Sequence, residues 1–100
     1  MEIKIKENSL LAWFAAKKLK SAQVAIVWKN TIYLHNTSKN DFLEDKRWVR
    51  HELKHVEQFN YYGAIPFVVR YLWESLKKGY YNNRYEVEAR RAELSGLLVL

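Results

Sequence analysis

The segment with the clearest capacity for chemistry is His51-Glu52-Leu53-Lys54-His55, an HExxH sequence. On a helix, residues four positions apart lie on one face, so the imidazoles of His51 and His55 can bind a single metal ion. Glu52 then lies beside that ion, where it can take a proton from water that the metal has made more acidic. The pentapeptide therefore predicts a hydrolytic zinc site. The alternative is a solvated helix face, where charged residues usually lie.

The residues around this motif favour the metal site over the solvated face. With about 100° of rotation per residue, Glu52 falls at the edge of an apolar arc, which is an unusual position for a carboxylate. The apolar residues of that arc are Phe42, Val49, Leu53, Val56 and Phe59. The neighbouring stripe holds His51, His55, Gln58 and Glu44. A carboxylate at a buried margin needs a polar partner, and metal-activated water would provide one.

A catalytic zinc site also needs a third protein ligand. The chain has no cysteine, so this ligand must be another histidine, for which only His35 remains, or a carboxylate. Residues 83–93 predict the start of a second amphipathic helix with several acidic side chains. On that helix Glu86 and Glu88 lie about 200° apart, so only one of them can face the histidines. Glu86 also has a competing role, because its spacing from Asn83 fits a capping box.

These motifs together resemble a known family. HELKH, followed by Gln58 and then by Glu86-Val87-Glu88-Ala89, is similar to the gluzincin class of zincin metallopeptidases, and most of all to CAAX-prenyl-protease-like peptidases and the very small minigluzincins. The resemblance covers roughly residues 24–93. It implies a peptide or protein substrate and one Zn²⁺ per chain. The implied zinc ligands are His51, His55 and Glu86. The implied general acid/base is Glu52.

One position departs from the family pattern. Relatives usually have an aspartate four residues after the ligand glutamate, where it can orient a ligand histidine, and such residues influence metal affinity. This chain has Arg90 there. We expect Glu93, Glu57 or a backbone carbonyl to take over the orienting role. The departure leaves two functions open: an active or latent zinc peptidase, and an inactive zinc-binding relative that serves as a binding or scaffold protein.

The element pattern predicts an α+β fold in a single domain of residues 1–100. By the resemblance the fold is zincin-like: a small mixed or antiparallel sheet packs on the active-site helix, and later helices carry the third ligand. The first elements predicted are a strand within residues 1–6, a helix from Ser9 to about Lys20 with Leu10, Trp13, Phe14 and Leu19 inward, and a hairpin of strands 24–28 and 31–35. The active-site helix follows and runs to about Tyr61, and Ser38 or Asp41 caps either this helix or a short helix before it. The next helix has Pro66 in its first turn and ends at Lys77-Lys78-Gly79. The last helix starts near Asn83.

Zincins pair an extended substrate with an edge strand of the sheet, and by this resemblance residues 31–35 are the expected edge strand. An ordinary antiparallel strand is equally consistent with this segment. A hydrolytic site also needs a hydrogen-bond donor for the oxyanion of the tetrahedral intermediate. The candidate donors are Tyr80, Tyr81, Tyr85 and His35, and the sequence does not select among them.

The composition leaves a function of another class open. The 100 residues carry a formal net charge of +6, which is compatible with a basic nucleic-acid-binding module. The basic residues are scattered and form no nucleic-acid motif, so a nucleic-acid partner is not expected. No signal peptide or membrane-spanning segment is apparent, which favours the cytoplasm. The apolar segment 96–100 predicts either packing on the core or a tail that lies in the cleft and restrains activity.

Overall fold

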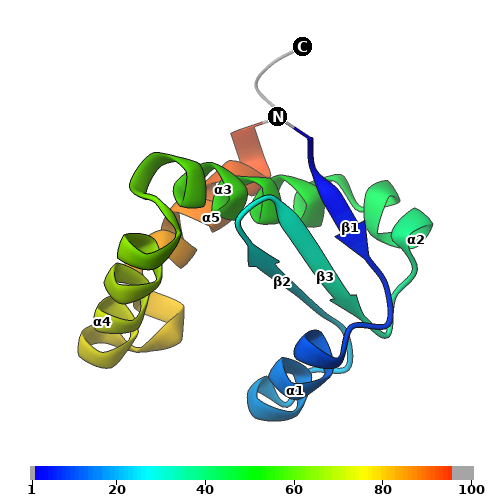
Figure 1. Cartoon of the computed structure of the whole chain (residues 1–100), viewed down its shortest axis with the longest axis horizontal. Coiled ribbons are helices and arrows are strands. Elements are labelled where there is room, and N and C mark those ends of the chain that lie inside the picture. Colours follow the sequence, from blue (N-terminus) through cyan, green and yellow to red (C-terminus); the bar gives the residue numbers. More distant parts are fainter. Residues whose placement is uncertain (1, 96–100) are drawn as a thin grey trace.

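Three strands and five helices follow one another along residues 2–95, which are the residues that this computed structural model describes (Figure 1). In chain order they are β1 (Lys4–Lys6), α1 (Leu10–Leu19), β2 (Val24–Trp28), β3 (Thr31–His35), α2 (Lys39–Glu44), α3 (Lys46–Tyr62), α4 (Ala64–Asn82) and α5 (Arg84–Ser95). The strands form one mixed sheet, which confirms the predicted α+β class. None of the described helices is both long and apolar enough to cross a membrane. The two predictions for residues 96–100 fall outside the described residues.

The order of strands in the sheet is β1-β3-β2. The predicted hairpin is confirmed, because β2 pairs antiparallel with β3 from Val24 opposite His35 to Trp28 opposite Thr31. The prediction that residues 31–35 form the edge is wrong. β1 pairs in parallel with the other side of β3, with Ile5 opposite Ile32, so that β3 is central and β2 is an edge strand. Tertiary packing decides which strand pairs with a strand of three residues, and no local sequence pattern predicts it.

Helix α1 packs on the hairpin through its small side chains. Ala12 and Ala16 are buried against Val24, since alanine lets a helix backbone come close to a sheet. Ser9 caps the helix as predicted, with its Oγ accepting a hydrogen bond from the Ala12 N–H at 3.2 Å. The predicted orientation of the large residues is wrong, because all four are exposed to solvent: Leu10, Trp13, Phe14 and Leu19.

Helix α3, which carries the HExxH motif, has its own start. Asp45 caps it by accepting from the Trp48 N–H at 3.1 Å, and Ser38 caps the short helix α2 before it. The alternative cap Asp41 is wrong, since Asp41 lies in the first turn of α2 and donates its backbone N–H to Ser38. The core under α3 contains the predicted Phe42 and Val56 beside Ile32 and Leu34, with Val49 partly buried. Of the predicted arc, Leu53 is the member that faces solvent.

Helix α4 begins with Pro66 in its first turn, as predicted, and is interrupted where the sequence predicts its end. Gly79 has φ +80° and ψ 167°, a conformation open almost only to glycine, and the short turn after it leads into α5. Asn83 caps α5, since its Oδ1 accepts from the Tyr85 N–H at 2.8 Å. Helices α5 and α3 lie side by side (Figure 1), and this packing brings residues 86–93 to the histidine face of α3.

Candidate metal centre

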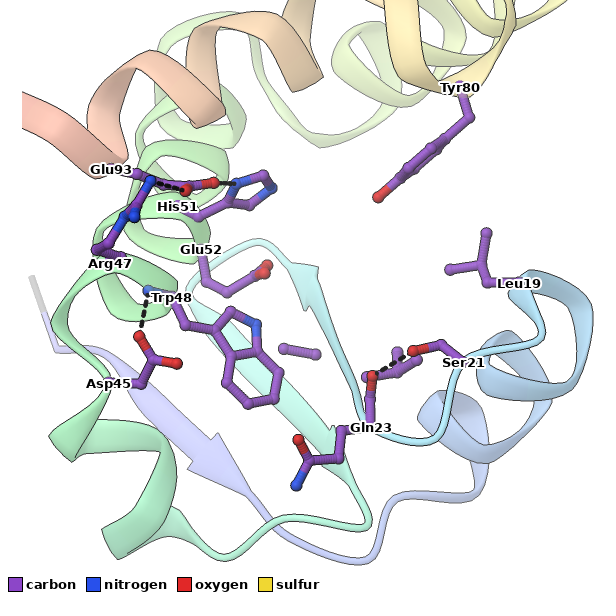
Figure 2. Close-up of a pocket in the computed structure, with 12 residues that line it drawn as sticks. Leu19, Ser21, Gln23, Asp45, Arg47, Trp48, His51, Glu52, Tyr80 and Glu93 are labelled. Carbon is purple, nitrogen blue, oxygen red and sulfur yellow. Dashed lines mark hydrogen bonds and ion pairs between the residues drawn. The ribbon is translucent and has the colours of Figure 1, made fainter.

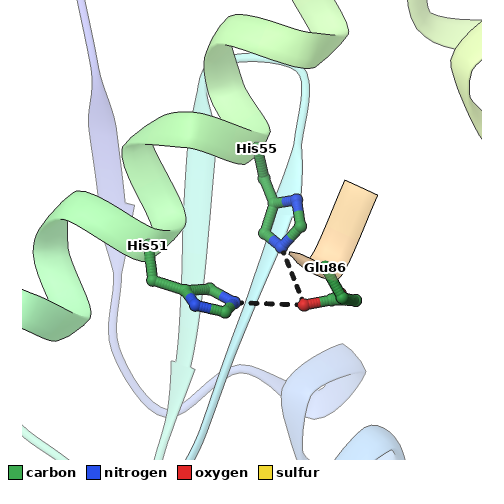
Figure 3. Close-up of side chains that lie close together, drawn as sticks. All are labelled: His51, His55 and Glu86. Atoms are coloured by element: carbon green, nitrogen blue, oxygen red, sulfur yellow. Dashed lines mark hydrogen bonds and ion pairs between the residues drawn. The ribbon is translucent and has the colours of Figure 1, made fainter. Parts of the chain in front are cut away.

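Three side chains from two helices converge on one point (Figure 3). The Nε2 atoms of His51 and His55 lie 3.1 Å and 3.3 Å from Oε1 of Glu86. In a tetrahedral zinc site, ligands at about 2.0–2.1 Å from the ion are separated from one another by roughly 3.3 Å. The three ligand atoms all lie within 4.8 Å of one another, so the group could hold a metal ion.

Both histidines are held by their other ring nitrogen. Nδ1 of His51 lies 2.8 Å from Oε2 of Glu93, and Nδ1 of His55 lies 2.9 Å from Oε1 of Gln58. These contacts fix each ring so that Nε2 is the atom turned to the centre. Such outer partners set the tautomer and basicity of a ligand histidine.

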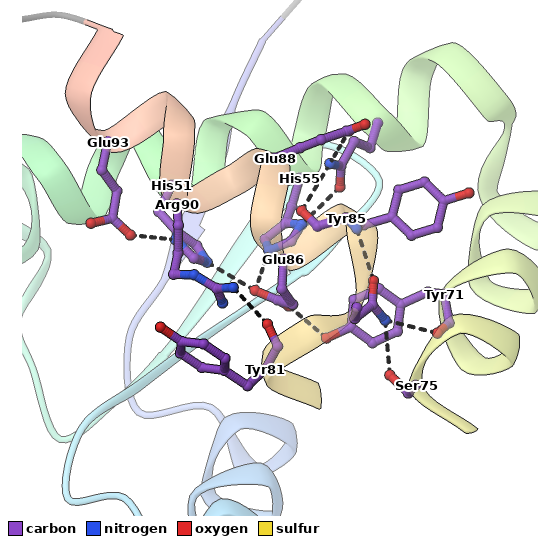
Figure 4. A network of polar contacts seen from close by, with 12 residues as sticks. His51, His55, Tyr71, Ser75, Tyr81, Tyr85, Glu86, Glu88, Arg90 and Glu93 are labelled. Atoms are coloured by element: carbon purple, nitrogen blue, oxygen red, sulfur yellow. Dashed lines mark hydrogen bonds and ion pairs between the residues drawn. The ribbon is translucent and has the colours of Figure 1, made fainter. Parts of the chain in front are cut away.

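Glu86 is oriented in the same way. Tyr71 donates its hydroxyl proton to Oε2 of Glu86 at 2.5 Å, and this leaves Oε1 turned to the histidines (Figure 4). Every one of the three candidate ligands therefore has a partner that holds the atom opposite to the one it offers. The arrangement is the outer shell expected around a metal.

Gln58 and Glu88 complete the support of His55. The amide nitrogen of Gln58 donates to the Tyr85 carbonyl at 3.1 Å and to Oε1 of Glu88 at 3.0 Å, so its carbonyl oxygen must face the imidazole. Glu88 thus contacts Gln58, while Glu86 faces the histidines. The tertiary structure in this way decides between the two carboxylates that the sequence leaves open.

The competing role of Glu86 in a capping box is absent. Its two carboxylate oxygens bind His51, His55 and Tyr71, while the backbone N–H of Asn83 bonds to the Tyr80 carbonyl. The carboxylate that does serve the start of α5 comes from α4. Glu74 accepts from the Arg84 N–H at 3.1 Å, which no local motif could predict.

The group carries strong electrostatic coupling. Burial favours the neutral forms of the histidines, but hydrogen bonds with Glu86 outweigh it, and the pKa of His51 rises to about 9 while that of His55 also rises. Burial acts to raise the pKa of Glu86, yet the hydrogen bonds from His51, His55 and Tyr71 hold it far below its usual range. These hydrogen bonds thus favour the ionised form of Glu86, which is the form that could bind a metal ion.

Glu52 lies next to this group, and its pKa shifts in the direction opposite to that of Glu86. Its side chain is only 6% exposed, and burial raises its pKa to about 7, although the neighbouring His55 and His51 lower it. A carboxyl group that titrates near neutral pH can both accept and return a proton. The sequence position of Glu52 at the margin of the apolar arc already pointed to this burial.

An open cleft lies in front of the metal-binding group. Two adjoining pockets of about 670 and 600 Å³ share His51, Glu52, Tyr80, Leu19 and Ala25. In Figure 2, Tyr80 and Leu19 face His51 and Glu52 across the first pocket. One end of the cleft is polar, with Ser21, Gln23, Asp45, Arg47 and Glu93. The other is apolar, with Ile26, Val27, Trp28, Phe59, Phe67, Val68 and Leu72.

The three tyrosines predicted as oxyanion donors lie in different environments. Tyr80 lines the cleft, and burial first, then the charges of Glu86 and Glu52, raise its pKa to about 12, so its hydroxyl stays protonated. Tyr81 is 69% exposed. The ring of Tyr85 is buried in the core.

His35 and Arg90 also lie elsewhere. His35 pairs with Val24 at the end of β3 and lines neither pocket. Arg90 donates to the Tyr81 carbonyl and lies over its ring at 4.0 Å. Of the candidate replacements for the missing aspartate, Glu93 fills the role, whereas Glu57 pairs with Lys54 at 3.1 Å.

Tyr71 is the functional residue that sequence reasoning missed. Its one signal is position, because Tyr71 follows the buried Phe67 by one helical turn and a buried tyrosine hydroxyl requires a partner.

No protein-family model matches the chain, and no curated protein or solved structure is significantly similar to it. A proposed function therefore depends on the geometry of the candidate metal centre.

Proposed function

We propose that this chain is a zinc-dependent peptidase of minimal size with a zincin-like arrangement of sheet and active-site helix. His51, His55 and Glu86 would hold the ion, and Glu52 would transfer protons. One observation carries the proposal: three ligand atoms converge while the opposite atom of each ligand is bound by Glu93, Gln58 or Tyr71. In metal sites, partners of this kind fix the orientation of the ligand side chains.

When bound, Zn²⁺ supplies a Lewis acid that polarises a carbonyl group and makes water more acidic. Glu52 accepts a proton from the attacking water at its carboxylate and delivers it to the leaving amine, a role for which its raised pKa is suited. Its burial excludes competing solvent. Tyr80, protonated and turned to the cleft, donates to the oxyanion that develops on the substrate.

The sheet edge at β2 indicates how a peptide would bind. Among the described strands, β1 and β2 each have a single neighbour, and residues 24–28 of β2 run along both halves of the cleft. An extended peptide beside β2 would gain main-chain hydrogen bonds and be held across the metal centre. The apolar half, with Val27 and Phe67, would accept a hydrophobic side chain of that peptide.

The decisive experiment is metal analysis of the purified protein and of His51→Ala, His55→Ala and Glu86→Ala variants. We expect about one zinc per chain in the parent protein and a loss of zinc in each variant. Glu57→Ala is the control, because it removes a carboxylate that pairs with Lys54 and contacts neither the candidate ligands nor their partners among the described ion pairs. Retention of zinc by Glu86→Ala would contradict the assigned ligand set.

Hydrolysis is tested separately with a library of fluorogenic peptides. Glu52→Gln should abolish cleavage while the zinc content stays at that of the parent protein. Zinc binding without cleavage of any peptide would instead assign the chain to the inactive, binding-protein alternative. A protein that does not bind added zinc would overturn both the peptidase and the inactive zinc-binding alternative.

A further inference from the structure

Helices α1 and α4 both expose large apolar side chains. In Figure 1, α4 lies to one side of the sheet and α1 lies below its lower end. Residues of both helices line the apolar half of the cleft. Leu10 and Phe14 of α1 are 69% and 59% exposed, and Leu76 of α4 is 79% exposed. The other exposed apolar residues of α4 include Ile65, Val69, Leu72 and Trp73. The spacing of Ile65, Val69, Leu72 and Leu76 places these residues on one face of α4, and an exposed apolar face of this kind marks an interaction surface.

The charge on these helices has one sign. Of the eleven acidic residues of the chain, α1 has none and α4 has only Glu74, which is buried and bonded to the Arg84 N–H. The exposed basic side chains of α1, its C-cap and α4 are Lys17, Lys18, Lys20, Arg70, Lys77 and Lys78. Lys77 and Lys78 pair with Glu74 at 3.6 and 3.4 Å. The excess positive charge beside the apolar surface therefore comes from the remaining four cations, Lys17, Lys18, Lys20 and Arg70.

Both helices repeat one arrangement of tryptophan and lysine. Lys17 lies over the ring of Trp13 at 5.0 Å, and Lys77 lies over the ring of Trp73 at 5.8 Å. In each case the pair is spaced by one helical turn and exposed. Tryptophan beside a basic residue is the composition that favours the boundary between lipid headgroups and acyl chains.

A second copy of the chain fits this surface poorly. Ile65, Val69, Leu72 and Leu76 do have the spacing of a helix-packing seam. Self-association through α1 and α4 would, however, bring the excess positive charge of both copies together, since Glu74 is the single acidic residue of the two helices. An anionic surface meets both requirements, since it accepts apolar side chains and neutralises the cations.

We propose that α1 and α4 dock this protein onto the surface of an anionic lipid bilayer. The apolar side chains of both helices enter the boundary of the acyl chains, and the flanking lysines contact acidic headgroups. Lys18 and Leu19 of α1 and Val68 and Leu72 of α4 line the apolar half of the cleft, so its mouth opens toward the bilayer. The docking itself requires no metal and is independent of the proposed peptidase activity.

The test is co-sedimentation with vesicles of phosphatidylcholine alone or with one-third phosphatidylglycerol. Binding is expected to the anionic vesicles only and to weaken with added salt. K17Q/K18Q should lower the affinity by about 30-fold, on the basis of about 1 kcal/mol per basic residue near the surface. The matched control K39Q/K46Q makes the same change of net charge in α2 and at the start of α3, and should leave binding unchanged.

A second pair of variants tests the apolar contact. Leu76→Ser in α4 should weaken binding, whereas Leu43→Ser, at an exposed leucine of α2, should not. Equal binding to neutral vesicles, equal loss in K39Q/K46Q, or no binding would overturn the proposal. So would a dimer in analytical ultracentrifugation that becomes a monomer in Leu76→Ser, because this face would then belong to a second copy.

Discussion

Glu93 holds Nδ1 of His51 at 2.8 Å from a position seven residues after Glu86. Two turns of helix return almost to the starting direction, so residues i and i+7 share a face more closely than i and i+4 do. The carboxylate at residue 93 can therefore take the orienting role that the gluzincin pattern gives to an aspartate at the position of Arg90. Glu93 is in turn paired with Arg47 at 3.5 Å.

Removal of this carboxylate should weaken the metal site without unfolding the chain. For Glu93→Ala we expect the zinc dissociation constant to rise by roughly 10- to 100-fold, since the imidazole of His51 loses the partner that orients it. Competition with a zinc-binding dye measures the change. Glu57→Ala is the control, because Glu57 pairs with Lys54 on the exposed side of the same region; equal losses in both variants would contradict the role of Glu93.

Tyr71→Phe should also lower zinc affinity, for a different reason. The variant keeps the ring, and with it the packing against Phe67, but leaves the buried Oε2 of Glu86 without its donor. An unsatisfied buried acceptor costs about 1–3 kcal/mol, which corresponds to a loss of about 5- to 150-fold in affinity when it falls on the metal-bound geometry. Isothermal titration with zinc gives the value, and an unchanged dissociation constant would exclude the orienting role.

Tyr80→Phe separates binding from catalysis. Tyr80 lines the cleft and makes no contact with the ligand atoms of the metal centre among the described hydrogen bonds, so zinc affinity should remain that of the parent protein. If its hydroxyl stabilises the oxyanion, kcat should fall by about 10²- to 10³-fold with little change in KM. Tyr81→Phe, at the neighbouring exposed tyrosine, is the matched control and should retain full activity. A rise in KM alone would assign Tyr80 to substrate binding.

Gly79→Ala should destabilise the fold through the backbone alone. A Cβ at Gly79 meets no atom within 4 Å, yet its φ of +80° and ψ of 167° strain any L-residue. Such strain costs of order 1–3 kcal/mol of unfolding free energy. Urea denaturation measures this cost. A variant that is as stable as the parent protein would show that the turn before Tyr80 adopts another conformation.

Glu74 should make the stability depend on pH in the acid range. The hydrogen bond from the Arg84 N–H, followed by the contacts with Lys78 and Lys77, lowers the pKa of Glu74 from its ordinary value of 4.5. A pKa that is lower in the folded state stabilises the fold above the unfolded value, and this contribution disappears as the pH falls through the folded value.

The variant Glu74→Gln isolates this contribution. The difference in unfolding free energy between the parent protein and Glu74→Gln should be largest near neutral pH and shrink below about pH 4.5. Thermal denaturation monitored by circular dichroism in a series of buffers provides the comparison. A difference that stays constant with pH would mean that the carboxylate charge of Glu74 does not contribute.

Local patterns in the sequence determined much of the candidate site. The i, i+4 spacing of His51 and His55 places both imidazoles on one helix face wherever that helix packs, and the pattern around Glu52 predicts its burial. The hairpin from Val24 to His35 and the cap at Ser9 also follow from short-range chemistry. Each of these features depends on residues within a few positions of one another, so the amino-acid sequence alone is enough to predict them.

Tertiary packing decided the rest. Glu86 and Glu88 have the same side chain, and only the contact between α3 and α5 turns the first to the histidines and the second to Gln58. Tyr71 reaches Glu86 from a third helix, and the place of β3 in the middle of the sheet depends on β1, a strand remote in sequence. Helix α1 buries Ala12 and Ala16 because small side chains permit the closest approach to the hairpin, although its largest apolar residues predicted the opposite face. Such choices depend on which surfaces meet, and no periodicity within a single element records them.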